Sequence, residues 1–268
     1  MTTKTKTKMP TPTLTPKAPT PAAITKATRA QLEAIAQPDV RTQQRAYFKN
    51  AVDFIGVKMP KVREVAAAMM PSLKDADVDD VVAVAFAFLR SPLMEMKSVG
   101  AAVLERRKKE LDDAFLDELA PLFDEGHVAD WATCDDLAGH VLRELVARSA
   151  ATRKRVIAWS RAKNEWQQRA SAVAFANECR KLCHGDDILD VCSHIVRSQG
   201  RFVQLGCGWA LREMSVHEME RVIAFIDDNA KHLSREGLSY AVEKMPLVVR
   251  VDVKARHAAQ SGRGKRAV

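Results

Sequence analysis

Several features are scarce in this 268-residue chain, and each scarcity excludes a class of protein. Aromatic residues make up only 6% of the sequence and dipeptides typical of tight turns are few, which disfavours a fold of many short strands. No apolar run approaches the ~20 uncharged residues of a membrane-spanning helix. The N-terminus also lacks the apolar middle of a signal peptide. We therefore expect an all-α protein in the cytoplasm, with no part in a membrane.

Cysteine is also sparse. Five cysteines in a chain of this length, an odd number, argue against a disulfide framework and for reduced thiols. Cys179, Cys183, His184, Cys192 and His194 fall close together, which raises the possibility of a metal site. Zinc ligands usually come as tight pairs that flank a turn, whereas Cys179 and Cys183 have the i, i+4 spacing of a helix. We interpret them as buried thiols and expect no metal and no other cofactor.

The net charge of +8 comes from the two ends of the chain. Residues 1–30 contain six basic residues and no acid, and residues 250–268 contain six basic residues and one acid. The remainder has 30 basic and 33 acidic residues, a net charge of −3. Basic arms of this kind either raise the affinity for a polyanion such as DNA or keep the ends of a chain in solution. The composition leaves both interpretations open.

The composition predicts three segments. Residues 1–25 belong to a low-complexity stretch with ten threonines and five prolines by residue 30, and we expect a disordered basic arm. Residues 26–250 are predicted to form one helical domain, and residues 251–268 a flexible basic tail. The predicted helices are Lys26–Ala36, Arg41–Asn50, Lys61–Met70, Val78–Leu89, Leu93–Glu110, Asp113–Asp124, Val128–Arg148, Thr152–Trp159, Glu165–Leu182, Asp187–Val196, Phe202–Met214, Val216–Asp228 and Ser234–Met245.

Local signals mark several of the boundaries between these helices. Ser215 followed by Glu218 has the spacing of a capping box, which predicts a helix start there. Four prolines fall between predicted helices, at Pro38, Pro60, Pro71 and Pro92. Short helices joined by short polar links, in pairs of about forty residues, predict an α-solenoid of HEAT-like antiparallel helix pairs with a curved, concave surface.

The helix predicted at Val128–Arg148 contains an unusual acid. An apolar stripe follows one face of it, and Asp135 lies one turn after Trp131. An unpaired buried carboxylate costs several kcal/mol, so Asp135 requires a partner, a solvent-lined groove or a function. One interpretation is an ordinary ion pair with Arg143 or Arg169. The next residue, Asp136, points about 100° away around the helix, and we expect it to face solvent or to form a salt bridge.

Chemically distinctive residues recur at the repeat length. Arg169 lies 38 residues after Trp131, Trp209 lies 40 residues after Arg169, and Tyr47 lies 84 residues before Trp131. Equivalent positions in successive repeats project from one continuous surface. The periodicity therefore predicts that these four side chains face the same groove. The alternative is that the spacing arises by chance and that the indoles are simply buried.

Four segments in this order resemble one known family. They are "AYFKNAVDFIGVKMPKVREV" (46–65), "WATCD" (131–135), "NEWQQRASAVAF" (164–175) and "GCGWALREM" (206–214). Together they resemble the AlkD-type DNA alkylation repair enzymes, which are HEAT-like-repeat DNA glycosylases. The resemblance spans about residues 40–247. The basic arm and the C-terminal tail have no counterpart in it.

The resemblance implies a monomeric protein whose concave groove holds double-stranded DNA. Such an enzyme removes purines alkylated at N3 or N7 in base excision repair of alkylation damage, with the lesion left stacked in the duplex. By match of residues, the catalytic cluster is Asp135, Trp131 and Trp209, Arg169 contacts the DNA backbone near the lesion, and Tyr47 and Arg212 line the DNA groove. The place of action implied is the cytoplasm, close to the nucleoid.

Two functions remain open on the sequence alone. The first is a monofunctional glycosylase that uses water, because no lysine nucleophile is apparent at the site and lyase activity is therefore not expected. The second is a HEAT-repeat scaffold that binds DNA or another protein and performs no chemistry. The sequence does not fix which alkylated purine is preferred.

Overall fold

Segments 20–49, 51–176 and 184–261 are described by the computed structural model, and every regular element in them is helical, as the sequence predicted. Within them no helix combines the length and the apolar character that crossing a membrane requires. The helices are α1 (Pro21–Ala34), α2 (Pro38–Tyr47), α3 (Met59–Met69), α4 (Val78–Leu89), α5 (Met94–Arg107), α6 (Phe115–Asp124), α7 (Trp131–Asp136), α8 (Arg143–Arg148), α9 (Ala150–Ala158), α10 (Glu165–Ala176), α12 (Gly185–Ile195), α13 (Arg201–Met214), α14 (Met219–Asp228), α15 (Arg235–Ala241) and α16 (Leu247–Gln260).

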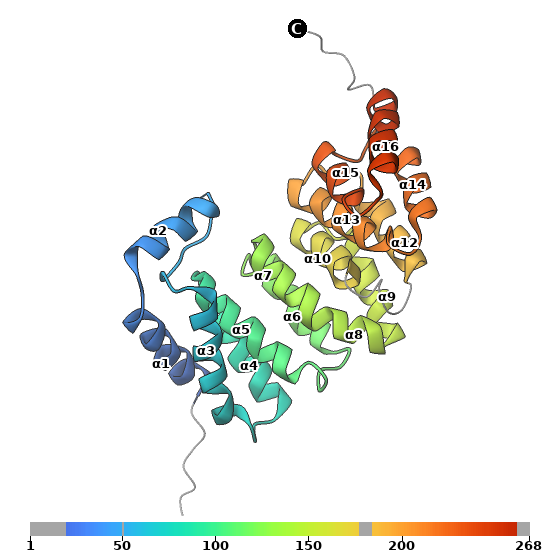
Figure 1. Cartoon of the computed structure of the whole chain (residues 1–268). Helices are drawn as coiled ribbons and strands as arrows, with labels where there is room; N and C mark the ends of the chain where they lie inside the picture. The colour runs from blue at the N-terminus through green and yellow to red at the C-terminus, as the bar shows by residue number, and fades with distance from the viewer. Residues whose placement is uncertain (1–19, 50, 177–183, 262–268) are drawn as a thin grey trace, which may run out of the picture.

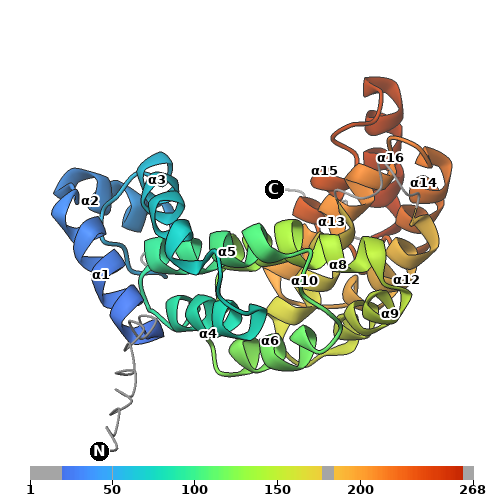
Figure 2. The same cartoon turned by 90° about the horizontal axis from the view of Figure 1, so that it is seen from below.

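The helices follow one another across the molecule in chain order (Figure 1). Seen from below, α4 and α6 lie beneath α5, so that the middle of the molecule has two layers (Figure 2). In the same view α2 and α3 at one end, and α15 and α16 at the other, stand up on the same side of the middle helices. Side chains on that side therefore come from segments far apart in the sequence.

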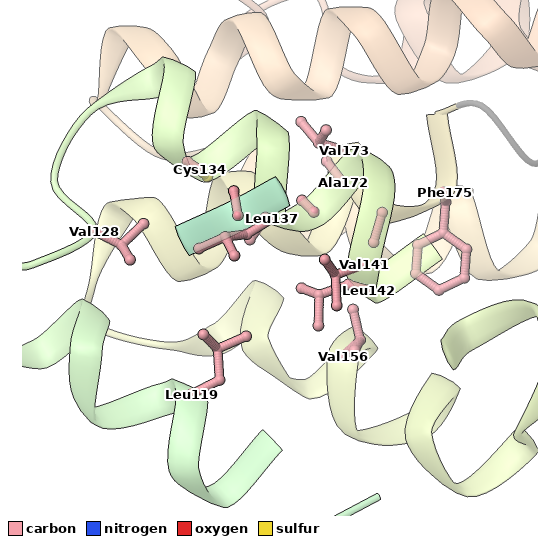
Figure 3. Packing of buried hydrophobic residues seen from close by; sticks show 14 of the residues in the cluster. Leu119, Val128, Cys134, Leu137, Val141, Leu142, Val156, Ala172, Val173 and Phe175 are labelled. Atoms are coloured by element: carbon pink, nitrogen blue, oxygen red, sulfur yellow. The ribbon is translucent and has the colours of Figure 1, made fainter. Parts of the chain in front are cut away.

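One apolar core runs between the layers. Its centre is the segment after α7, whose buried side chains Leu137, Val141 and Leu142 meet residues of α6, α9 and α10 (Figure 3). Contacts of this kind contribute roughly 25 cal/mol for each Å² of apolar surface removed from water. The core therefore fixes α7 against α10, the two helices that hold the acid and the guanidinium singled out by the sequence.

The predicted helix Val128–Arg148 is not a continuous α-helix. It begins at Trp131, because Asp130 accepts a hydrogen bond from the Thr133 amide at 2.8 Å and caps the first turn. Residues Leu137–Leu142 then form a π-helical segment before α8. Such turns are rare inside α-helices and occur frequently at functional sites. The predicted apolar stripe is confirmed as buried at every position except Trp131, which is half-buried.

Glycines allow α13 and α15 to approach closely. A Cβ added to Gly208 would lie 2.4 Å from the carbonyl oxygen of Gly237, which is closer than any real Cβ contact. A Cβ on Gly206 would lie 3.3 Å from Cγ of Arg169 in α10. These short approaches bring three helices together at one place and set the position of Trp209, the next residue after Gly208.

We expect Gly208→Ala to destabilise the protein. In an ordinary helix this change is stabilising by roughly 0.5–1 kcal/mol, but here the added methyl forces α13 and α15 apart. Overpacking of this kind lowers the free energy of unfolding by about 1–3 kcal/mol. Thermal unfolding followed by circular dichroism measures the change. A melting temperature equal to or above that of the wild type would contradict the close approach.

A buried acid fixes the chain between α2 and α3. Glu95 on α5 accepts hydrogen bonds from the amides of Ile55, Gly56 and Val57 at 2.9, 2.9 and 3.0 Å. The preceding residue, Phe54, packs against Phe48 with ring centroids 5.2 Å apart. Glu95 therefore anchors the segment that follows α2, and with it the aromatic residues at the end of that helix.

Both predicted domain boundaries are misplaced. Helix α1 begins at Pro21, with a proline in its first turn and Thr20 as its N-cap, so the helical body starts before residue 26. Helix α16 was not predicted, and it extends through most of the segment assigned to the flexible tail. Valines and charges alternate in its sequence, but Val253 and His257 are buried, and His257 Nε2 lies 3.1 Å from the Leu233 carbonyl oxygen. Residues 1–19 and 262–268 lie outside the described segments.

The predicted capping box is wrong. The Ser215 hydroxyl donates to the carbonyl oxygen of Arg212 at 2.8 Å, at the C-terminal end of α13. Helix α14 begins at Met219, and Glu218 forms a salt bridge with Arg221 instead of capping the helix. Both side chains of the motif are thus engaged elsewhere. In contrast, α4 has the predicted bounds Val78–Leu89.

Candidate active site

An acid and a guanidinium form the centre of the site. Arg169 on α10 donates from Nε to Oδ1 of Asp135 at 2.8 Å and from Nη2 to Oδ2 at 2.7 Å. The side chains of Arg169 and Asp135 are 7% and 18% exposed. Of the two partners that the sequence left open for Asp135, the structure therefore places Arg169 in a bidentate pair. The Asp135 side chain nevertheless keeps some exposure to solvent.

Arg169 is itself held by a third helix. Its Nη1 donates to the carbonyl oxygen of Phe202 at 2.6 Å, at the start of α13. Three of the five N–H groups of the guanidinium thus bind protein acceptors, and two remain. The side chain is consequently fixed between α7, α10 and α13, and Asp135 is fixed with it.

Burial and pairing act on the carboxyl in opposite directions. Burial raises the pKa of Asp135, and the nearby Asp130 adds to the rise, while the hydrogen bonds and the charge of Arg169 lower it. The result is a pKa above the ordinary value of 3.8. Burial is the largest effect on the pKa of Arg169 and lowers it, but the hydrogen bonds and charge of Asp135, with smaller contributions from Cys134 and Tyr240, together outweigh burial and raise that pKa. Asp135 therefore depends on Arg169 to stay ionised.

Trp131 belongs to an aromatic group that includes Tyr47 and Phe48 at the end of α2. Its indole stacks on Phe48 with ring centroids 4.9 Å apart and an interplanar angle of 3°. Tyr47 meets Trp131 edge-on at 6.1 Å and is 73% exposed. Two of these residues were predicted to face the groove. Phe48 was missed, although it follows Tyr47 directly within the quoted segment "AYFKNAV".

Trp209 belongs to a second group. The guanidinium of Arg212 lies 5.9 Å from the ring centroid of Trp209 and 5.2 Å from that of Tyr240. Arg212 also pairs with Glu243 at 2.7 Å and with Glu213 at 2.9 Å. Within the described segments, Trp209 Nε1 is buried and has no hydrogen-bond partner. Tyr240, which is exposed, carried no signal in the sequence because α15 brings it to Arg212 only through the fold.

The structure does not bring the two tryptophans into ring contact. Trp131 stacks within the first group and Trp209 within the second, and Arg169 contacts the helices that carry both. The predicted site residues are thus connected through the pair of Asp135 and Arg169. Trp131 precedes Asp135 by four residues on α7, and Trp209 lies on α13, the helix whose Phe202 carbonyl holds Arg169.

A pocket of about 770 Å³ lies next to the first group, between α2, α3, α5 and α7. Its lining includes Gln44, Tyr47, Phe48, Trp131 and Asp136. The expectation that Asp136 faces bulk solvent or forms a salt bridge is wrong. The side chain is half-buried in the pocket wall and forms no hydrogen bond or ion pair within the described segments. Asp136 therefore lines this pocket, whereas Asp135, its neighbour in sequence, faces Arg169.

We expect Asp136→Asn to stabilise the protein at pH 7.5. Burial raises the pKa of Asp136 to about 6 from the ordinary value of 3.8, with Asp135 and Glu105 raising it further and His140 and Arg63 lowering it. Because the native state holds its proton more tightly, this group lowers the free energy of unfolding as pH rises from about 4 to about 6. The amide removes that penalty, about 1–3 kcal/mol.

Urea unfolding of wild type and variant at pH 4.5 and pH 7.5 measures the effect. The exposed acid Asp79 in the first turn of α4 supplies the matched control, because Asp79→Asn makes the same change of charge outside the pocket. If Asp136→Asn is less stable than the wild type at pH 7.5, the claim that Asp136 is half-buried without a partner is contradicted.

The possible metal site falls partly outside the described segments, since Cys179 and Cys183 are not described. Among the residues that are, no cluster of three metal-ligating side chains occurs. Cys134, Cys192 and Cys207 are buried, and burial raises the pKa of Cys134 well above its ordinary value. The interpretation of Cys179 and Cys183 as buried thiols falls on residues outside the described segments.

The protein is thus an all-helical protein with a buried pair of acid and guanidinium near aromatic side chains. Comparison with known proteins identifies its family. The model of the DNA alkylation repair enzyme family matches residues 28–245, and the chain belongs to that family. The solved structure of a predicted DNA alkylation repair enzyme from Enterococcus faecalis is similar, with a TM-score of 0.69 over 79% of this chain and 97% of that chain. At 15% identity this likeness shows the fold. No curated protein matches the chain.

Proposed function

We propose that the protein is a DNA glycosylase that hydrolyses the N-glycosidic bond of cationic N3- or N7-alkylated purines in double-stranded DNA. The observation that carries the proposal is the state of Asp135. Its carboxylate is held in one orientation by two hydrogen bonds, and the side chain is mostly removed from water but still 18% exposed. Membership of the DNA alkylation repair enzyme family supports the substrate class.

The chemistry requires little beyond a fixed negative charge. Alkylation at N3 or N7 makes the purine a cation, so the base leaves without being protonated. When the bond from C1′ to the base nitrogen breaks, its electron pair goes to the base, which becomes neutral, and the sugar takes the positive charge. A preorganised carboxylate stabilises that charge. It also orients a water molecule, whose oxygen attacks C1′ while its proton passes to the carboxylate.

The indoles are proposed to contribute to the same charge. The negative face of an aromatic ring attracts a cation by about 0.5–2 kcal/mol, more when water is excluded. Trp131 and Trp209 lie on the two helices that Arg169 joins, so we assign them to opposite sides of the deoxyribose. In this assignment Asp135, Trp131 and Trp209 are the catalytic residues.

Arg169 acquires two proposed roles. Its hydrogen bonds to Asp135 and to the Phe202 carbonyl fix the orientation of the carboxylate. Its positive charge favours the ionised form of Asp135. The two N–H groups that remain are suited to a phosphate next to the lesion. Tyr47, because it is largely exposed, and Arg212, beside Trp209, are proposed to contact the DNA on either side.

The proposal includes the shape of the molecule. We infer that the paired helices form a HEAT-like solenoid and that the side between its raised ends is a concave surface that receives the duplex (Figure 2). The basic end segments beyond the described residues then add affinity that falls with salt. No resident cofactor enters this mechanism.

The competing function is a scaffold that binds DNA or protein without chemistry. Duplex DNA treated with a methylating agent distinguishes the two, because free methylated purines are measured by chromatography. The glycosylase proposal predicts release of N3-methyladenine, N7-methylguanine or both, above spontaneous loss. Tight DNA binding with no release above the spontaneous rate would support the scaffold instead.

A further inference from the structure

The pocket beside Trp131 shares a wall with the proposed active site. Trp131 lines it, and so do Asp136 and His140 from the same helical segment. Consecutive residues of a helix point about 100° apart, so α7 directs Asp135 towards Arg169 and Asp136 into the pocket. A volume of about 770 Å³ is in the range of small-molecule sites. The mechanism proposed above makes no use of this space.

Two polar groups in the pocket wall lack a partner. Gln44 donates from Nε2 to the Val57 carbonyl oxygen at 2.9 Å, but its Oε1 is buried and accepts no hydrogen bond among the described residues. Asp136 likewise accepts none there. A buried acceptor left unsatisfied, such as Oε1 of Gln44, costs about 1–3 kcal/mol. Both unpaired groups are acceptors, so the complementary ligand carries N–H donors.

The rest of the wall suits a flat ligand. Phe48 and Trp131 stack face to face, and Tyr47 lies edge-on to Trp131. Met59 and Met70 complete the apolar lining, and thioethers make favourable contacts with aromatic rings. Glu105, the other acid of the lining, lies 3.3 Å from His140, which leaves Asp136 as the acid without an ion pair there.

We propose that this pocket binds a free alkylated purine, the base released by cleavage of the glycosidic bond. This inference rests on the proposed function. A purine is flat, and the exocyclic amino group of either base, with the ring N1–H of N7-methylguanine, matches the acceptors of Gln44 and Asp136. Since the base is neutral once released, it loses its attraction to the site of Asp135. The pocket next to Trp131 then receives it and separates it from the abasic sugar.

Isothermal titration calorimetry of the full chain with N3-methyladenine and with N7-methylguanine, without DNA, tests the proposal. We expect saturable binding of at least one base. Gln44→Met removes an acceptor, and Asp136→Asn removes the negative charge and replaces one acceptor oxygen with a donor, each at nearly constant volume. Each change should weaken binding about tenfold, because a net hydrogen bond contributes about 0.5–1.5 kcal/mol and more to a charged group. The control Asp79→Asn should bind as the wild type does.

The outcomes separate the pocket from the active site. Asp135→Asn should keep the affinity for the free base, because that carboxylate faces Arg169 and not the pocket. No saturable binding, or equal affinity in the wild type and both pocket variants, would overturn the pocket proposal even if the wild type releases bases from DNA. Saturable binding lost in the pocket variants would support it even if no base were released, in which case the proposed function would fail instead.

Discussion

Asp135→Asn is expected to lower the rate of base release from duplex DNA carrying N7-methylguanine by about 10²-fold or more. Asparagine has nearly the same shape but no charge, so the sugar cation loses its counter-charge and the attacking water loses the base that takes its proton. Single-turnover assays with excess protein, analysed by chromatography of the free base, isolate the bond-breaking step from DNA binding.

Two controls make this result specific. The change also leaves Arg169 without a counter-charge in a buried position, so circular dichroism must show that the variant is folded at the assay temperature. Asp79→Asn, on the exposed first turn of α4, removes the same charge and should release base at the wild-type rate. Equal rates for Asp135→Asn and wild type would remove the catalytic role from this carboxylate.

Arg169→Met is expected to affect both stability and the pH dependence of catalysis. Methionine keeps the aliphatic length but leaves Asp135 buried without a cation. Breaking a buried ion pair from one side lowers the free energy of unfolding by about 3–5 kcal/mol. It also removes the interaction that lowers the pKa of Asp135, so burial raises that pKa further.

The sign of the pH effect follows from the proposed mechanism. Catalysis requires ionised Asp135, so in Arg169→Met the activity should be lost at low pH and recover in part as pH rises, with its acidic limb above that of the wild type. Rates of base release between pH 5 and pH 8.5 measure the shift. A loss of activity by the same factor at every pH would show that Arg169 acts on the DNA alone and not through Asp135.

The sequence predicted the helical class and much of the element order because the apolar periodicity of the helices is strong. The bounds of α4 follow from a simple apolar helix between turn residues. Helix α16 was missed because its stability comes from two buried contacts, Val253 and His257, and not from its local pattern. The π-helical segment after α7 was missed as well, since nothing in the residue spacing distinguishes it from an α-helix.

For the candidate site, the spacing of residues in the sequence was enough to identify Asp135 but not to decide whether its partner is Arg143 or Arg169. The repeat period put Arg169 on the same surface as Asp135, but only the fold shows two hydrogen bonds between them. Asp136 was assigned to solvent because a helix wheel contains no information about α3 and α5, which enclose it. Tyr240 reaches Arg212 through the contact of Gly208 with Gly237, which depends on tertiary structure.

The central claim is that Asp135 stabilises positive charge on the sugar, and one binding measurement tests it most directly. Duplex DNA is prepared with a pyrrolidine whose protonated nitrogen replaces C1′ at an abasic position, and a second duplex carries the neutral tetrahydrofuran analogue. We predict that the wild type prefers the cationic sugar by about tenfold or more, and that Asp135→Asn loses this preference. The same preference in both proteins, or none in the wild type, would contradict the claim.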